Sequence, residues 1–281
     1  MTKFYPLWWN PWGDRGLDLK KNVSISIDNL DCDEAAEYKI LFLAEPYSIL
    51  PTVTEGALRG AMKFDKIYTF TQKIIDHYPQ AELFEWGSSW LDFKDLKLNK
   101  GNNVTFVTSE KYQTLGHKLR LDIYELLKSI DVSNGLQYYA HKSPPFHDRR
   151  NDFFESAKFH IAVENSRQKN YFTEKIIDCF ASKTVPIYYG CPNIGNWFNM
   201  DGIITFNTID ELENILTNLD EKKYDVRLDA IEDNYIKAKK FHSDNDVVPR
   251  LTDRIVKAVS YTHLRAHETR GNLVCRLLLE K

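Results

Sequence analysis

The sequence predicts an α/β protein built from parallel sheets in two domains. Short apolar runs alternate with helical periodicity, which is typical of parallel sheets covered by helices. The length of 281 residues suits two compact domains. A polar stretch over residues 94–103 marks the expected boundary. We therefore expect one domain over residues 1–100, a second over 101–240, and a helical segment over 241–258 that packs back toward the first.

The first domain shows three apolar runs that predict strands, with helices between them. The first run ends at Glu45, because Pro46 forces the residue before it into an extended conformation. The third run is closed by Gly87. The predicted strands cover residues 39–44, 66–71 and 83–86.

The second domain alternates strands and helices more regularly. The helix over residues 117–130 places Leu119, Ile123 and Leu126 on one face, as an amphipathic helix requires. Open sheets of this kind bind ligands at the carboxyl ends of their strands. The predicted strands cover residues 104–108, 136–139, 159–163, 185–189 and 203–206, and further helices cover 174–180 and 209–219.

Composition excludes several classes of protein. The net charge of −3 provides no strong field toward nucleic acid or anionic lipid, so an anionic ligand requires a local basic cluster. The four cysteines include no C-x-x-C pair, which argues against zinc and redox motifs. No apolar run approaches the roughly 18 residues of a membrane span. With no leader peptide recognised, we expect a cytoplasmic protein, and peripheral attachment to the inner membrane stays open.

The C-terminal residues 259–281 differ in character from the rest of the chain. The run VSYTHLRAHET resembles the translation of a sequencing adapter, so we interpret this segment as a non-native read-through tail. A native amphipathic helix is the alternative. The tail is left out of the fold prediction.

Candidate chemistry concentrates between residues 159 and 198. A predicted strand ends in Glu164-Asn165-Ser166, at the sheet edge where ligands bind. Thr173 stands at the N-cap position of the next helix, which opens with Glu174 and Lys175. Helix N–H groups backed by a lysine favour phosphate. Asn165 and Glu174 suit sugar hydroxyls and Tyr171 offers a stacking face, although a solvated polar loop is the simpler alternative.

Three elements in order carry a family resemblance. They are Glu164-Asn165-Ser166, then Tyr171-Phe172-Thr173-Glu174-Lys175, then TVPIYYGCPNI over residues 184–194. Together they resemble the signature of glycosyltransferase family 10, the α-1,3/1,4-fucosyltransferases. The resemblance implies a GT-B fold, in which two Rossmann-like domains face an interdomain cleft. It also implies inverting transfer of L-fucose from GDP-fucose to a hydroxyl of an oligosaccharide acceptor. Transfer from another GDP-sugar stays open, as does a non-catalytic sugar- or nucleotide-binding protein on this fold.

The resemblance also implies roles for single residues. The acceptor would lie on the domain over residues 1–100 and the GDP-sugar donor on that over 101–240. Glu45, in Leu43-Ala44-Glu45-Pro46, is the candidate catalytic base, and Glu55 and Glu34 are weaker competing candidates. The candidate donor-binding residues are Arg120, Asn165, Tyr171, Glu174 and Lys175, with Lys118, Thr173 and Ser166 as secondary candidates.

The resemblance requires no metal or other cofactor, and no motif supports Mn²⁺ or Mg²⁺. The D-x-D sequence at Asp31–Asp33 lies in an acidic loop that no predicted strand delivers, and Asp244–Asp246 is weaker. Two departures from the family stand near the donor motif: Lys183 replaces a common glycine, and Cys191 replaces a frequent acidic residue. Trp86 and Trp90 are further candidates for the lining of the cleft. The oligomeric state stays open.

Overall fold

The protein was analysed as a computed structural model. The structure describes residues 2–7, 17, 19, 21–91, 93–94, 96–130, 135–142, 150–242 and 247–260. Almost all of the proposed read-through tail, from residue 261 onward, therefore lies outside the described residues, as does the second D-x-D sequence. Among the described residues no helix has the length and apolar character needed to cross a membrane.

The first sheet, within the described residues, has five parallel strands in chain order. Helices α1 (Pro51–Gly60) and α2 (Gln72–His77) connect its later strands and bury Ala57 and Ile74 against one face. The strands are β1 (Lys3–Pro6), β2 (Val23–Ile27), β3 (Tyr38–Leu43), β4 (Lys66–Thr69) and β5 (Ala81–Leu83).

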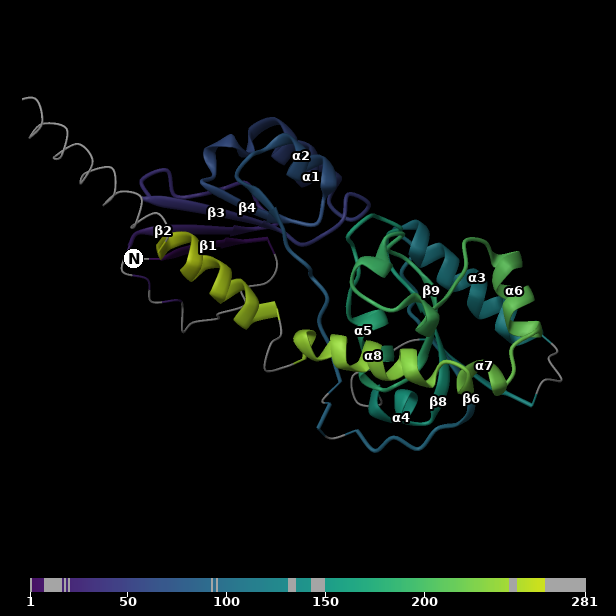
Figure 1. Cartoon of the computed structure of the whole chain (residues 1–281). Helices are drawn as coiled ribbons and strands as arrows, with labels where there is room; N and C mark the ends of the chain where they lie inside the picture. The colour runs from purple at the N-terminus through teal and green to yellow at the C-terminus, as the bar shows by residue number, and fades with distance from the viewer. Residues whose placement is uncertain are drawn as a thin grey trace, which may run out of the picture.

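The opposite face of this sheet is covered by the C-terminal end of the described chain. A helix over residues 247–260 crosses back from the second domain and lies along the first sheet (Figure 1). Its apolar side chains recur every four residues, so they share one helix face and pack on the sheet. Because β3 is covered on both faces, its sequence is a continuous apolar run rather than an alternating one. The residues of this helix in the core are Val247, Leu251, Ile255 and Val259.

The second sheet has five parallel strands in the spatial order β10-β9-β8-β6-β7 within the described residues. The strands are β6 (Gly101–Thr108), β7 (Gln137–Lys142), β8 (Ala157–Val163), β9 (Val185–Tyr189) and β10 (Ile204–Thr205). The order reverses between β8 and β6. The carboxyl ends of these two strands therefore form the crevice in which such sheets bind ligands.

Helices cover both faces of the second sheet (Figure 1). On one face α5 and α8 bury Ile176, Phe180 and Ala238, and on the other α3 and α6 bury Ile123 and Leu212. The helices are α3 (Leu115–Ser129), α4 (Arg150–Glu155), α5 (Glu174–Ala181), α6 (Ile209–Thr217), α7 (Lys222–Asp225) and α8 (Leu228–Ala238). The predicted strand and helix alternation of this domain is confirmed, with ends shifted by a few residues.

Strand β2 was not predicted, and the reason lies in its serines. Ser24 and Ser26 are fully buried, although their polarity suggests an exposed face. Ser26 Oγ donates to the Asp31 carbonyl at 2.6 Å, and Ser24 Oγ accepts from the Asp33 N–H at 3.0 Å. Buried hydroxyls are stable when they are hydrogen-bonded in this way.

The same bonds explain the first D-x-D sequence as a structural loop. Its backbone is held on β2, and the Asp33 carboxylate pairs with Lys3 at 2.7 Å. In the part of the chain that the structure describes, no group of three or more His, Cys, Asp or Glu side chains is placed to hold a metal ion.

The lysine at position 183 occupies the turn that follows α5. Its φ is +55°, a left-handed conformation that favours glycine, which accounts for the glycine expected there from the family. The Lys183 ammonium pairs with Glu232 and lies 4.6 Å from the centre of the Tyr235 ring. These contacts oppose the strain of the turn.

Candidate functional site

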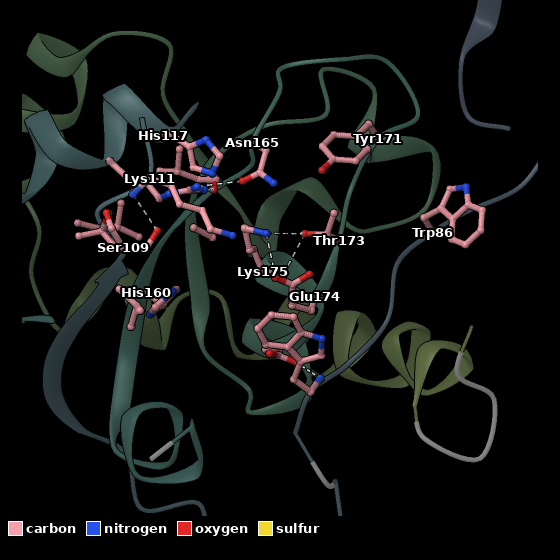
Figure 2. A pocket seen from close by; sticks show the side chains of 18 of the residues that line it. Trp86, Ser109, Lys111, His117, His160, Asn165, Tyr171, Thr173, Glu174 and Lys175 are labelled. Carbon is pink, nitrogen blue, oxygen red and sulfur yellow. Dashed lines mark hydrogen bonds and ion pairs between the residues drawn. The ribbon is translucent and has the colours of Figure 1, made fainter. Parts of the chain in front are cut away.

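A pocket of about 620 Å³ lies between the carboxyl end of β3 in the first sheet and the ends of β6 and β8 in the second. A volume of this size suits a ligand as large as a nucleotide. Figure 2 shows Asn165, Tyr171, Thr173, Glu174 and Lys175 gathered at it. The crevice expected at the reversal of strand order is therefore the place where the polar side chains converge.

The pocket brings together the primary site residues that the sequence predicts. Trp86 and Trp90 line it as well, whereas Lys118 and Ser166 are not among its lining residues. Lys118 is exposed on α3. The predicted residues that line the pocket are Glu45, Arg120, Asn165, Tyr171, Thr173, Glu174 and Lys175.

Arg120 is a buried cation on α3. Its guanidinium is 7% exposed and donates to the Val163 carbonyl at 2.6 Å and to Asn165 Oδ1 at 2.9 Å. Within the described residues no carboxylate lies at ion-pair distance from it. Because a buried cation is costly without an anion, this site suits an anionic ligand in the pocket. The planar fork of arginine matches the oxygens of a phosphate.

Lys175 and Glu174 open helix α5 and form an ion pair at 2.8 Å. Burial opposes ionisation of the Glu174 carboxyl, but the Lys175 ammonium outweighs it and lowers the pKa of Glu174. Burial likewise disfavours the ammonium, yet Glu174 and Glu164 together raise the pKa of Lys175. Both groups are therefore charged at neutral pH, and Lys175 supplies a cation beside Arg120.

Glu164 lies fully buried beneath the start of α5. Its carboxylate accepts the Thr173 N–H at 2.9 Å and the Thr173 hydroxyl at 2.7 Å. Thr173 is the N-cap, as predicted, but its donors are already used by Glu164. The sequence placed Glu164 at the sheet edge without giving it a role. It anchors the turn that carries Glu174 and Lys175.

Glu45 reaches the pocket from the other sheet, directly after β3. Burial raises the pKa of its carboxyl, the Lys175 ammonium opposes this, Glu174 adds to it and Lys111 opposes it. A carboxylate that accepts a proton is a better base when its pKa lies closer to the working pH. The environment of Glu45 therefore suits general-base chemistry.

Tyr171 packs in the pocket wall between the two sheets. Its side chain is 3% exposed, and its ring centre lies 4.9 Å from that of Phe70 in the first domain. The two rings are tilted by 43°, so Phe70 packs against the Tyr171 ring without stacking on it. The remaining surface of Tyr171 lines the pocket, beside Asn165 and Thr173.

Two pocket residues that the sequence did not single out are Lys111 and Asp178. Lys111 lies in the loop after β6 and contributes a third cation (Figure 2). Asp178, on α5, accepts from Ser89 Oγ at 2.8 Å and from the Trp90 N–H at 2.9 Å. These bonds join the segment that follows β5 to the helix. A signal for Lys111 was available, since it follows the end of a predicted strand. None existed for the contact to Asp178.

Gly116 allows α3 to approach the end of β8 closely. A Cβ atom at this position would lie 1.9 Å from the Glu164 carbonyl oxygen. We expect Gly116→Ala to lower the free energy of unfolding by about 1–3 kcal/mol, as overpacking does elsewhere. Urea unfolding followed by circular dichroism measures this loss.

Gly60→Ala is the matched control, because a Cβ there has no neighbour within 4 Å. We expect it to change stability by less than about 0.5 kcal/mol. Equal stability of the two variants would show that α3 has room to move away from β8.

Comparisons with known proteins agree with this geometry. Residues 98–228 match the family model described as glycosyltransferase family 10 (fucosyltransferase) C-term. The alpha-(1,3)-fucosyltransferase FucT of Helicobacter pylori is 32% identical over 113 residues, which are 38% of this chain. The chain spans 22% of that relative's length.

Solved structures extend the similarity to the first domain. An alpha1,3-fucosyltransferase solved with GDP-fucose covers 83% of this chain, with 81% of its own length, a TM-score of 0.51 and 16% sequence identity. Another, solved with GDP, covers 75% of this chain and 69% of its own, with a TM-score of 0.46 and 19% identity. The first of these shows that both domains share the GT-B fold. Residues 98–228, just under half of the chain, are therefore similar to the C-terminal part of glycosyltransferase family 10.

Proposed function

We propose that this protein is an inverting glycosyltransferase that transfers L-fucose from GDP-fucose to a hydroxyl group of an oligosaccharide. One observation carries the proposal: the Glu45 carboxylate of the first sheet and the Arg120 and Lys175 cations of the second line the same pocket. The family match and the fucosyltransferase relatives support the choice of donor.

The proposal divides the reaction between the two domains. The domain over residues 1–100 holds the acceptor and supplies Glu45. The domain over residues 101–240 holds the GDP-sugar, and the segment over 241–258 connects back to the first domain. The pocket between the sheets supports this division, since residues from both line it.

In the proposed reaction, Glu45 removes the proton from the acceptor hydroxyl as its oxygen attacks the anomeric carbon of fucose. The new C–O bond forms on the face opposite the bond to GDP. That bond breaks, and its electron pair leaves with the diphosphate. The configuration at the anomeric carbon is therefore inverted, and the proton ends on Glu45.

In the proposal, cationic side chains stabilise the negative charge that develops on GDP. Arg120 is preorganised by its bonds to Val163 and Asn165, so it reorganises little as the charge appears. Lys175 adds a second cation at the start of α5. In this proposal these groups stabilise the leaving diphosphate without a metal, which transfer assays in EDTA test directly.

The remaining candidates hold the donor. Asn165, Tyr171 and Glu174 line the pocket beside the cations and are proposed to contact ribose, sugar or base. Thr173 contributes through the turn it forms with Glu164, since its donors are used there. Lys118 and Ser166, which lie outside the lining, stay secondary predictions.

Calorimetry with GDP, GDP-fucose and GDP-mannose in metal-free buffer, followed by transfer assays on oligosaccharides, tests the proposal. We expect saturable binding of GDP-fucose and transfer with inversion. Tighter binding and turnover of GDP-mannose would point to another donor, and binding without any turnover would point to a non-catalytic protein. A folded chain that binds no guanine nucleotide, also when ended at residue 260, would overturn the proposal.

A further inference from the structure

Asp28 lies at the end of the strand pair β2–β3, next to the peptide that carries Glu45. It directly follows β2, and its N–H donates to the Phe42 carbonyl at 2.9 Å. Its Oδ1 accepts the N–H of Ala44 at 2.8 Å and that of Glu45 at 3.2 Å. One residue therefore makes three hydrogen bonds to the four residues that end at Glu45.

The backbone of Asp28 is shaped for this contact. Its φ is +49°, a left-handed conformation that aspartate and asparagine adopt more readily than most residues. The turn places the carboxylate at the end of β3, beside the N–H groups of Ala44 and Glu45. The side chain is only 3% exposed. A buried carboxylate in an uncommon conformation indicates a specific task at this point of the sheet.

We infer that Asp28 is the positioning residue of Glu45, because it holds the peptide that carries the base. The inference rests on the proposed function of Glu45. Asp28 is not a lining residue of the pocket, so it acts through Glu45 rather than on substrate.

Burial also governs the charge of Asp28. Together with a smaller contribution from the Glu45 charge, burial raises the pKa of Asp28 to about 7 against the lowering effect of the two N–H donors. Glu45 is also faced by Lys175, Glu174 and Lys111 of the second domain, and its charge reaches the buried Tyr171 hydroxyl.

Two substitutions separate position from charge. Asp28→Asn keeps an oxygen that accepts the two N–H groups and tolerates the left-handed turn, but it removes the charge. Asp28→Ala removes both. We expect Asp28→Ala to lower kcat by about 10²-fold, as misplacement of a catalytic group does, with donor KM unchanged. We expect Asp28→Asn to retain most of kcat, because the amide oxygen still holds the peptide of Glu45.

Asp65→Ala is the matched control. The Asp65 carboxylate accepts the Lys39 N–H at 2.7 Å at the opposite end of β3, far from the pocket. It removes the same kind of carboxylate–backbone bond from the same strand. We expect kcat and the pH profile to stay as in the wild type.

Two readouts judge the contact between Asp28 and Glu45 without enzymatic activity. In ¹⁵N NMR of the Glu45 amide, which donates to Asp28 Oδ1 at 3.2 Å, we expect an inflection near pH 7 that Asp28→Asn removes. Stability gives the other. Unfolded Asp28 loses its proton near pH 4, at about its reference pKa, whereas folded Asp28 keeps it to about pH 7. The folded state binds more protons in this window, so stability falls as pH rises through it, and Asp28→Asn removes that fall.

The outcomes separate the inference from the proposed function. If the wild type transfers no sugar, the proposed function fails, and the NMR titration and stability still test the contact between Asp28 and Glu45. If the wild type is active and Asp28→Ala keeps kcat, the inference is wrong while the function stands. A Glu45 amide shift that is identical in wild type and Asp28→Asn across this pH range also overturns it.

Discussion

Glu45→Gln is expected to lower kcat by about 10²–10⁴-fold, the range that a positioned general base contributes. Glutamine has nearly the same shape, but it cannot take the proton from the acceptor hydroxyl. The affinity for GDP should change little, because the diphosphate cations lie on the other domain. Steady-state transfer assays measure the first effect and calorimetry the second.

The control for this substitution is Glu55→Gln. Glu55 lies in the same domain, accepts from the Tyr47 hydroxyl at 2.9 Å and does not line the pocket. Its loss should leave kcat unchanged. A loss in kcat of less than about tenfold in Glu45→Gln would be smaller than a general base contributes. Another group would then have to be the base.

The pH dependence of the wild type follows from the same residue. Glu45 must be ionised to act as a base, and burial holds its pKa above the usual value. Activity should therefore fall as pH decreases through this raised pKa, and the acid limb should disappear when Glu45 is replaced.

Alanine at Arg120 or Lys175 is expected to give the other large effect. Each substitution removes a cation from the place where charge develops on the diphosphate, which costs about 10²–10³-fold in kcat for comparable donors. GDP affinity should fall as well, because the cations also meet the ground-state diphosphate. Arg120→Lys should recover little, since a lysine cannot hold both Val163 and Asn165 with a planar fork.

Lys128→Ala tests whether the effect belongs to the site. Lys128 lies on the same helix as Arg120, is exposed and pairs with Glu125 at 3.0 Å. We expect no change in GDP affinity or kcat. Unchanged GDP binding in both Arg120→Ala and Lys175→Ala would contradict the assignment of the donor site.

The pocket residues proposed to hold the donor could be predicted from the sequence because their signals are local. Asn165, Thr173, Glu174 and Lys175 lie within 11 consecutive residues, where one strand end and one helix start follow each other. The position of a strand end determines which side chains reach the sheet edge, and an N-cap determines where a helix begins. The prediction of Thr173 as N-cap is confirmed on this basis.

Contacts across the chain could not be predicted in this way. The burial of Ser24 in β2 depends on a loop bond to Asp33, and the cover of the first sheet by Leu251 depends on a helix more than 200 residues away. Neither Asp33 nor the distant helix gives the segment that it contacts a recognisable periodic pattern of apolar residues. Strand β2 was missed for this reason.

The sequence by itself therefore determined the fold class and the residues of the donor motif, because periodicity and motif spacing act over short stretches of chain. The tertiary structure alone decided that Glu45 faces Lys175, that Asp28 holds the peptide behind Glu45, and that Arg120 is a buried cation. These features arise when two sheets pack and water is excluded between them. Burial and the approach of distant charges then set the chemistry of each group, and neither is encoded at any single position.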